Sequence, residues 1–283
     1  MNKEPLFAFF GTPAFAVAVL NALEKQELRP AVVITAPDRR QGRGMVLTPS
    51  PAKAWAIERG IDVLTPTTLT DQQLIAELAN TEWDVFVVAA YAKLIPKNIL
   101  DIPKRGSLNI HPSLLPKFRG PSPALTAILE DERATGVSVM QMEEKMDAGP
   151  VVAQAKVELE EEAWPLPGSE FEELLAAEGG NLLAEVLPFY LKGEVTPEPQ
   201  DESQATFTKK FTDADALIDL SGDARKNYLK IKAFDKSPRA YMLVDGKRVI
   251  IKDAEFIDGV LKITRVIPEG KKEVAYSDFV RVK

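Results

Sequence analysis

The stretch Leu6–Pro13, which reads LFAFFGTP, decides the fold of this chain. Five apolar residues form a run that ends at a Gly-Thr-Pro turn signal, and residues 15–23 then show helical periodicity. A buried strand followed at once by a helix is the opening unit of a parallel sheet, because parallel strands need a crossover between them. The stretch therefore predicts an α/β domain.

The same alternation continues along the first two thirds of the chain. We expect strands at residues 31–35, 84–89, 107–110, 137–140 and 151–157, and helices at residues 71–80, 124–130 and 169–191. Strands that alternate with helices are typical of a mainly parallel sheet covered on both faces. The sequence therefore predicts a doubly wound, Rossmann-like α/β domain over residues 1–191.

The last third of the chain has a different pattern. Residues 192–205 are polar and contain prolines, which predicts a linker. Beyond it we expect a helix at residues 224–234 and strands at residues 239–244, 248–251 and 260–266, with a hairpin turn at Asp245-Gly246. These elements predict a small β-rich domain over residues 206–283.

Composition excludes several classes of site. The 283 residues include no cysteine and one histidine, which rules out disulfides, thiolate zinc sites and multi-histidine metal sites. Apolar runs are too short to span a bilayer, and the N-terminus lacks a signal-peptide pattern. We therefore expect a cytoplasmic protein that binds no metal and no membrane.

The charge is unevenly distributed. Residues 205–283 carry 17 Lys and Arg against 12 Asp and Glu, a net charge of +5, whereas residues 1–204 carry 18 against 30, a net charge of −12. A basic C-terminal region favours binding of an anion such as RNA. The alternative is a lysine-rich surface that contacts only solvent, which would have the same net charge.

Two turns after strands are candidates for ligand binding. Of the spaced glycines that a dinucleotide-binding turn needs, the first turn has only Gly11, so we expect it to be structural or to lie near a substrate. The second is residues 36–51, a long loop with three arginines and two glycines. Such a loop favours a phosphate-bearing partner, with an ordinary surface loop as the alternative.

The strongest chemical candidates lie at the end of the strand at residues 107–110. Asn109 and His111 are two residues apart, so their side chains leave the strand on the same face, and Pro112 ends the strand. An amide beside an imidazole can polarise a carbonyl whose oxygen becomes negative. Because His111 is at an edge of the sheet, we expect it to bury little surface. Asp147, in a polar loop between two strands, could orient His111 or simply stabilise its own turn.

These motifs resemble those of the methionyl-tRNA formyltransferase family over nearly the whole chain. The resemblance rests on residues 10–16 (FGTPAFA), 37–51 (PDRRQGRGMVLTPSP), 109–120 (NIHPSLLPKFRG), 135–137 (TGV) and 146–150 (MDAGP). All folate-dependent formyltransferases share the Asn-x-His pattern with a later Asp, so that pattern implies the chemistry. The arginine loop and the second domain imply the acceptor.

The resemblance implies transfer of the formyl group of 10-formyltetrahydrofolate to the α-amino group of methionyl initiator tRNA. Asn109 and His111 would stabilise the oxyanion, and Asp147 would hold His111. The resemblance implies two further sets of residues. The folate would lie near Lys93, Leu94, Ile95, Ser113, Leu114, Leu115 and Pro116. The methionyl-tRNA would lie near Phe15, Arg39, Arg43, Lys209 and Lys210.

The resemblance also implies that the second domain is an OB-like barrel that contacts tRNA and that the protein is a monomer. The chain has fewer residues after Ile251 than the family pattern, so we expect a trimmed barrel. Two other functions stay open: a formyltransferase acting on an amino sugar, and an inactive relative that binds RNA.

Overall fold

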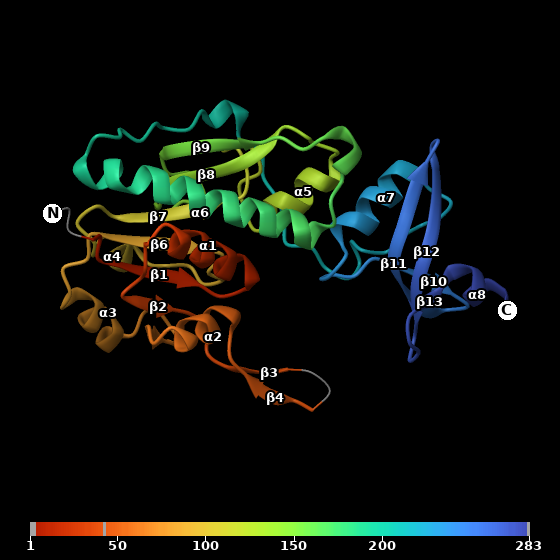
Figure 1. The fold of residues 1–283 in the computed structure, drawn as a ribbon, viewed down its shortest axis with the longest axis horizontal. Coiled ribbons are helices and arrows are strands. Elements are labelled where there is room, and N and C mark those ends of the chain that lie inside the picture. Colours follow the sequence, from red (N-terminus) through yellow and green to blue (C-terminus); the bar gives the residue numbers. More distant parts are fainter. Residues whose placement is uncertain (1–3, 42–43, 282–283) are drawn as a thin grey trace. The chain divides into compact units, whose positions relative to one another are not determined.

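The computed structural model describes residues 4–41 and 44–281, which form two compact units (Figure 1). The first unit comprises Met1–Arg119, Gly136–Val157 and Glu173–Thr206, and the second comprises Gly120–Thr135, Glu158–Glu172 and Phe207–Lys283. The predicted linker, residues 192–205, thus groups with the first unit.

A seven-stranded sheet forms the centre of the first unit. Its order is β5-β2-β1-β6-β7-β8-β9, with bounds Asp62–Leu64, Val32–Ile34, Phe7–Gly11, Val85–Ala89, Ser107–His111, Thr135–Gln141 and Val151–Val157. The pairs from β5 to β7 are parallel, and β8 runs antiparallel to β7. The predicted α/β fold with a mainly parallel sheet is confirmed.

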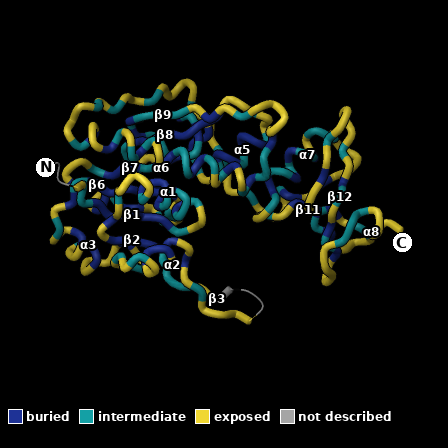
Figure 2. Tube along the Cα trace, viewed as in Figure 1, coloured by how far each residue is buried: buried dark blue, intermediate teal, exposed yellow. Residues whose placement is uncertain are grey.

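Helices cover both faces of this sheet (Figure 1). Side chains from α1 (Ala14–Lys25), α2 (Pro51–Glu58) and α6 (Gly168–Lys192) pack with Phe7 and Phe9 on one face. Side chains from α3 (Gln72–Ala79) and α4 (Lys97–Leu100) pack with Ala8 and Phe10 on the other. Alternate residues of β1 thus face opposite layers, and Figure 2 shows β1 as buried along its length. A continuous apolar run, rather than an alternating one, follows from this two-sided burial.

The segment expected as a long arginine loop contains a two-stranded antiparallel hairpin. Strand β3 (Arg39–Gln41) pairs with β4 (Val46–Thr48), with Arg39 opposite Thr48. After the hairpin, Ser50 accepts a hydrogen bond from the backbone N–H of Lys53 and so caps helix α2. The expectation of an irregular loop is therefore corrected for the described part of this segment.

The second unit contains a four-stranded antiparallel sheet. Strands β10 (Tyr241–Val244), β11 (Lys247–Ile257), β12 (Val260–Pro268) and β13 (Val274–Ala275) pair in that order. The unit also holds helices α5 (Pro123–Leu129), α7 (Ala224–Ala233) and α8 (Tyr276–Arg281) and the 3₁₀ turn η1 (Glu161–Ala163). The predicted small C-terminal β domain is confirmed as this antiparallel sheet.

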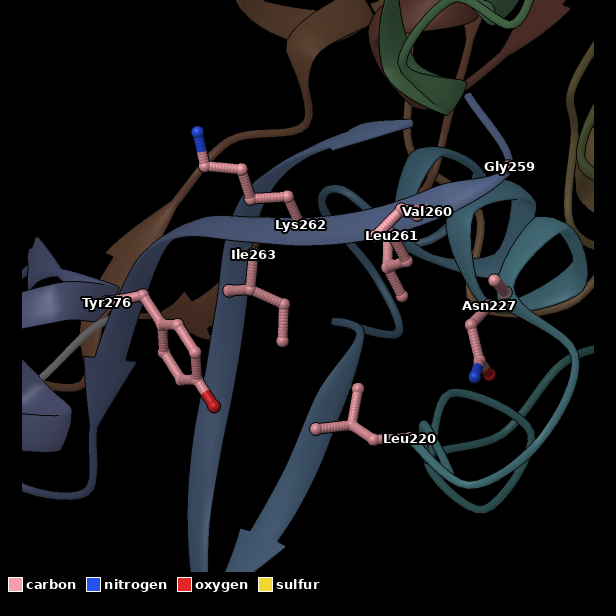
Figure 3. Close-up of a pocket in the computed structure, with 9 residues that line it drawn as sticks. Leu220, Asn227, Gly259, Val260, Leu261, Lys262, Ile263 and Tyr276 are labelled. Atoms are coloured by element: carbon pink, nitrogen blue, oxygen red, sulfur yellow. The ribbon is translucent and has the colours of Figure 1, made fainter. Parts of the chain in front are cut away.

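A cavity of about 510 Å³ lies in the second unit (Figure 3). Leu220 and Ile263 point into it, whereas Lys262, the preceding residue of β12, points to the other side of the strand. The cavity is therefore lined mainly by apolar groups and holds none of the candidate catalytic side chains. Among the described residues, no helix is long and apolar enough to cross a membrane.

Candidate active site

His111 is the last residue of β7 and is buried, with 4% of its surface exposed. Its ring Nε2 lies 2.9 Å from the carbonyl oxygen of Phe118. A carbonyl oxygen only accepts hydrogen bonds, so Nε2 carries a proton and Nδ1 points elsewhere. The expectation that His111 buries little was wrong, because the chain after Pro112 turns back and places Phe118 against the ring.

Nδ1 of His111 faces Asp147. The distance from Nδ1 to Oδ2 of Asp147 is 3.8 Å, and both side chains are largely shielded from solvent. This separation is too long for a hydrogen bond but is within ion-pair distance when the ring is protonated. Asp147 has a φ of 50°, in the left-handed region that tight turns use. The structure thus brings together two residues that are 36 positions apart in sequence.

Asn109 lies on the same face of β7 as His111, since the side chains of a strand alternate. Ile110 points to the opposite face, where a Cβ on Gly179 of helix α6 would lie 2.4 Å from its side chain. The two polar residues therefore face away from α6. Asn109 is half-buried, and no side-chain hydrogen bond from it to another described residue is present. Its amide can thus serve a substrate.

The segment Ser113–Pro116 follows directly and is hydrogen-bonded to residues of β8 and β9. The Ser138 hydroxyl donates to the Ser113 carbonyl at 2.6 Å and accepts from the Leu115 N–H at 3.0 Å. Gln154 donates to the Leu115 carbonyl at 2.8 Å. Ser113 and Leu115 are buried, whereas Leu114 and Pro116 are half-buried. Leu114 and Pro116 are therefore the members of this segment with surface available to a ligand.

The segment Lys93–Ile95 lies beyond the end of β6. Ile95 is buried, Leu94 is 77% exposed, and the Lys93 ammonium donates to the carbonyls of Pro66 and Thr67 at 2.6 and 2.8 Å. Burial, and then the charge of Arg39, lower the pKa of Lys93. The structure thus brings Arg39 close enough to Lys93 to contribute to this lower pKa.

Tyr91, two residues earlier, has a hydroxyl without a hydrogen-bond partner among the described residues. Its ring packs edge-on against Phe10, with the ring centres 5.6 Å apart. Burial raises its pKa to about 12, so the phenol is neutral over the physiological range.

The predicted tRNA-contacting residues are distributed over both units. In the first unit, Phe15 is half-buried at the start of α1, and Arg39 is exposed on β3. Arg43 lies outside the described residues. In the second unit, Lys209 and Lys210 are exposed, and the Lys209 ammonium pairs with Asp215.

Sequence reasoning missed the structural roles of three residues near the Asp147 turn, Arg119, Gln200 and Glu202. Arg119 is 1% exposed, and its guanidinium donates to Gln200 and Glu202. The hydrogen bonds from Arg119 and then Lys145 lower the pKa of Glu202 to about 2. Arg119 was noted as part of the motif at residues 109–120, but nothing in the local sequence marks Gln200 or Glu202, because their partners are more than 50 residues away.

The side chains of Asn109, His111 and Asp147 determine what chemistry this site can perform. An amide and an imidazole at one strand end can donate hydrogen bonds to an oxygen that becomes negative, and a carboxylate beside the imidazole can accept a proton. In residues 4–41 and 44–281, no group of three or more acidic or histidine side chains gathers where a metal could bind. The Asn109 amide and the His111–Asp147 pair are suited to acyl-type transfer by hydrogen bonding and proton transfer.

Comparison with known proteins places the chain among formyltransferases. The formyl transferase family pattern matches residues 5–166. The methionyl-tRNA formyltransferase of Roseiflexus sp. (strain RS-1) is 39% identical, and the match covers 96% of this chain and 91% of the relative. The methionyl-tRNA formyltransferase of Bacillus licheniformis is 37% identical over 96% of this chain and 93% of its own.

Solved structures share the fold at lower identity. HypX from Aquifex aeolicus, in complex with tetrahydrofolic acid, has a TM-score of 0.69 and 19% identity, over 98% of this chain and 47% of that chain. A sugar N-formyltransferase from Shewanella has a TM-score of 0.66 and 17% identity, over 90% of this chain and all of its own. At these identities the likeness shows the fold alone.

Proposed function

The chain belongs to the methionyl-tRNA formyltransferase family, and we propose that Asn109, His111 and Asp147 carry out its formyl transfer. Its activity is that of a methionyl-tRNA formyltransferase, an enzyme of translation initiation. The single observation that best supports the proposed residues is the 3.8 Å approach of Asp147 to a His111 ring whose other nitrogen is already bonded to Phe118.

The proposed reaction joins the methionyl amine to a formyl group. The family depends on folate, and we propose 10-formyltetrahydrofolate as the donor. A bond forms between the amine nitrogen and the formyl carbon, and the bond from that carbon to N10 of the folate breaks. The proton lost by the amine ends on N10. Tetrahydrofolate and N-formylmethionyl-tRNA are the products.

Each side chain has a distinct proposed task. The Asn109 amide donates a hydrogen bond to the formyl oxygen as it becomes negative. His111, when protonated on both nitrogens, is a second donor through Nδ1, because Nε2 donates to the Phe118 carbonyl and fixes the ring. Asp147 balances the positive ring and accepts the amine proton on its way to N10.

Kinetics can separate these tasks from substrate binding. Asn109→Ala and Asp147→Ala should each lower kcat by about 10²–10³-fold while KM for both substrates changes little, because the interactions exist mainly in the transition state. Lys156→Ala, a substitution of an exposed residue on β9, is the control. A rise in KM without a fall in kcat would assign the two residues to substrate binding.

We further propose that the acceptor is initiator methionyl-tRNA and that the β3–β4 hairpin contacts it. Arg39 is exposed on this hairpin, and the apolar side chains of Met45, Val46 and Leu47 are also exposed. Arginines bind phosphate, and exposed apolar groups at a hairpin tip are suited to contact with unstacked bases. Phe15 and the folate-side residues Leu94, Leu114 and Pro116 would line the remaining substrate surface.

Residues 205–283, with their net charge of +5, would supply further contacts with tRNA, including Lys209 and Lys210. Arg39→Ala and Lys210→Ala should raise KM for tRNA and reduce its salt dependence, with KM for the folate unchanged. Equal effects on both substrates would show that Arg39 shapes the folate site instead. We propose a cytoplasmic monomer, and analytical ultracentrifugation of the free protein tests the second point.

A further inference from the structure

Residues 198–206, here termed the strap, cross the loop that carries Asp147. At one end, Glu198 and Val151 exchange two backbone hydrogen bonds of 2.8 Å. At the other end, Thr206 accepts hydrogen bonds from the Phe118 N–H at its hydroxyl (2.8 Å) and from the Arg119 N–H at its carbonyl (2.9 Å). The strap is thus bonded on both sides of the His111–Asp147 pair.

Gln200 lies in the middle of the strap and uses every polar group of its amide. Its oxygen accepts from Nε and Nη2 of Arg119 at 3.0 and 2.8 Å. Its NH₂ group donates to the carbonyl of Asp147 at 2.9 Å and to the carbonyl of Gly149 at 2.7 Å. Two backbone carbonyls of the Asp147 turn are therefore held by one side chain.

Arg119 fixes the orientation of that amide. Its guanidinium is buried and can only donate hydrogen bonds, so it must face the oxygen of Gln200 rather than the NH₂ group. A reversed amide would place donors against Arg119 and an acceptor against two carbonyls. The amide thus has one favourable orientation, and that orientation directs both N–H groups to the turn.

We propose that Gln200 is a positioning residue that holds Asp147 at its distance from His111. The proposal rests on the function proposed above for the pair. The Gln200 amide donates to two carbonyls of the turn, which has a left-handed backbone at Asp147 (φ of 50°), so the strap supports the turn directly. The same strap, through Thr206, holds Phe118, whose carbonyl orients the His111 ring.

Gln200→Glu tests this role with the least change in shape. The variant keeps an acceptor for Arg119 but replaces two donors with a carboxylate oxygen facing two carbonyl oxygens. These groups repel, so the turn should move away from the strap and change the Asp147–His111 distance. A displacement near 1 Å at a reacting group lowers rates by up to about 100-fold.

The chain offers a matched control in Gln204→Glu. Gln204 is exposed on the same strap, and its amide donates to Asp201 at 2.8 Å, away from the turn. The control makes the same change of charge and of functional group. Gln200→Met, which carries no charge and cannot hydrogen bond in the same way, covers the case in which Gln200→Glu does not fold, as judged by thermal melting.

The readout besides turnover is the ¹⁵N NMR spectrum of the histidine ring. His111 is the sole histidine, so histidine-labelled protein without a tag gives one pair of ring signals. We expect Gln200→Glu to shift the Nδ1 signal at constant pH and to lower kcat by about 10- to 100-fold with KM unchanged. Gln204→Glu should change neither.

The outcomes separate the two proposals. An unchanged Nδ1 signal in Gln200→Glu would overturn the positioning role, whatever happens to kcat. A shifted Nδ1 signal with full kcat would support the positioning role and would refute the catalytic task of the pair. A shifted signal together with a lower kcat supports both.

Discussion

His111 and Asn109 lie two residues apart on one strand, yet the structure predicts very different costs for removing them. His111→Ala removes a buried ring and leaves the Phe118 carbonyl without its partner. A buried acceptor that is left without a hydrogen bond lowers stability by about 1–3 kcal/mol. The cavity adds about 1 kcal/mol. We therefore expect His111→Ala to lower the free energy of unfolding by about 2–4 kcal/mol.

Asn109→Ala should cost much less. The Asn109 side chain is half-buried and makes no side-chain hydrogen bond to another described residue. Removing it therefore leaves no described residue without a hydrogen-bond partner. We expect a change below about 1 kcal/mol, as for substitutions that remove no specific interaction.

Urea unfolding followed by tryptophan fluorescence measures this difference. Trp55 and Trp83 lie in the first unit, and Trp164 lies in the second. A Trp164→Phe background makes the signal report the unit that contains the substitutions, which matters because a chain of two units need not unfold in one step. Equal destabilisation by His111→Ala and Asn109→Ala, or a change below 0.5 kcal/mol for His111→Ala (about the size of a surface substitution), would refute the bonding assigned to the ring.

Three other substitutions test the surroundings of the site. Burial raises the pKa of Tyr91 from 10.0 to about 12, so the stability that its neutral phenol provides is complete below pH 10 and is lost as the pH rises through 12. Tyr91→Phe should therefore unfold at a higher urea concentration than the parent protein between pH 10 and 12; identical alkaline unfolding would contradict this. In Gly149→Ala, the new Cβ would lie 2.0 Å from the carbonyl oxygen of Gln141, so the catalytic turn must move by roughly 1 Å and kcat should fall about 100-fold in the transfer assay; a full rate in the folded variant would count against the turn geometry. The hydrogen bond from Arg119, followed by that from a lysine, lowers the pKa of Glu202 from 4.5 to about 2, so its contribution to stability is present above pH 4.5 and is lost as the pH falls through 2. Glu202→Gln should be less stable than the parent protein at pH 7, with the difference shrinking toward pH 2; a gap in urea midpoints that does not depend on pH would argue against the ion pairs.

The parallel sheet could be predicted because its strands carry a strong local signal. Strands β1 and β6 are buried on both faces, so every position is apolar and the run stands out from the sequence. Helix α3 was also predictable, since Asp71 provides the side-chain cap at its start and accepts from the Gln73 N–H. Such signals depend only on neighbouring residues.

The β3–β4 hairpin could not be predicted in the same way. Its strands are three residues long, and β3 consists of two arginines and a glutamine, which lack the alternation that marks a half-buried strand. Helix α2 did have a usable signal, because Ser50 before Pro51 is a typical helix start. That signal was hidden within a segment interpreted as one long loop.

The candidate catalytic side chains could be predicted from the sequence, but the residues that hold them in place could not. Asn109 and His111 followed from spacing on one strand, whereas the approach of Asp147 depends on how β8 and its following loop return to β7. The role of Gln200 had no local signal at all. A glutamine in a polar stretch indicates a linker by composition, and only the fold shows that its amide meets a buried arginine.

The most direct test of the central claim is single-turnover transfer of a labelled formyl group from 10-formyltetrahydrofolate to methionyl initiator tRNA, with the parent protein and His111→Ala at saturating concentrations of both substrates. We expect rapid transfer by the parent protein and a rate lower by about 10²–10⁴-fold in the variant, because the ring both donates to the oxyanion and takes part in proton transfer. Transfer by folded His111→Ala at the parental rate would contradict the account.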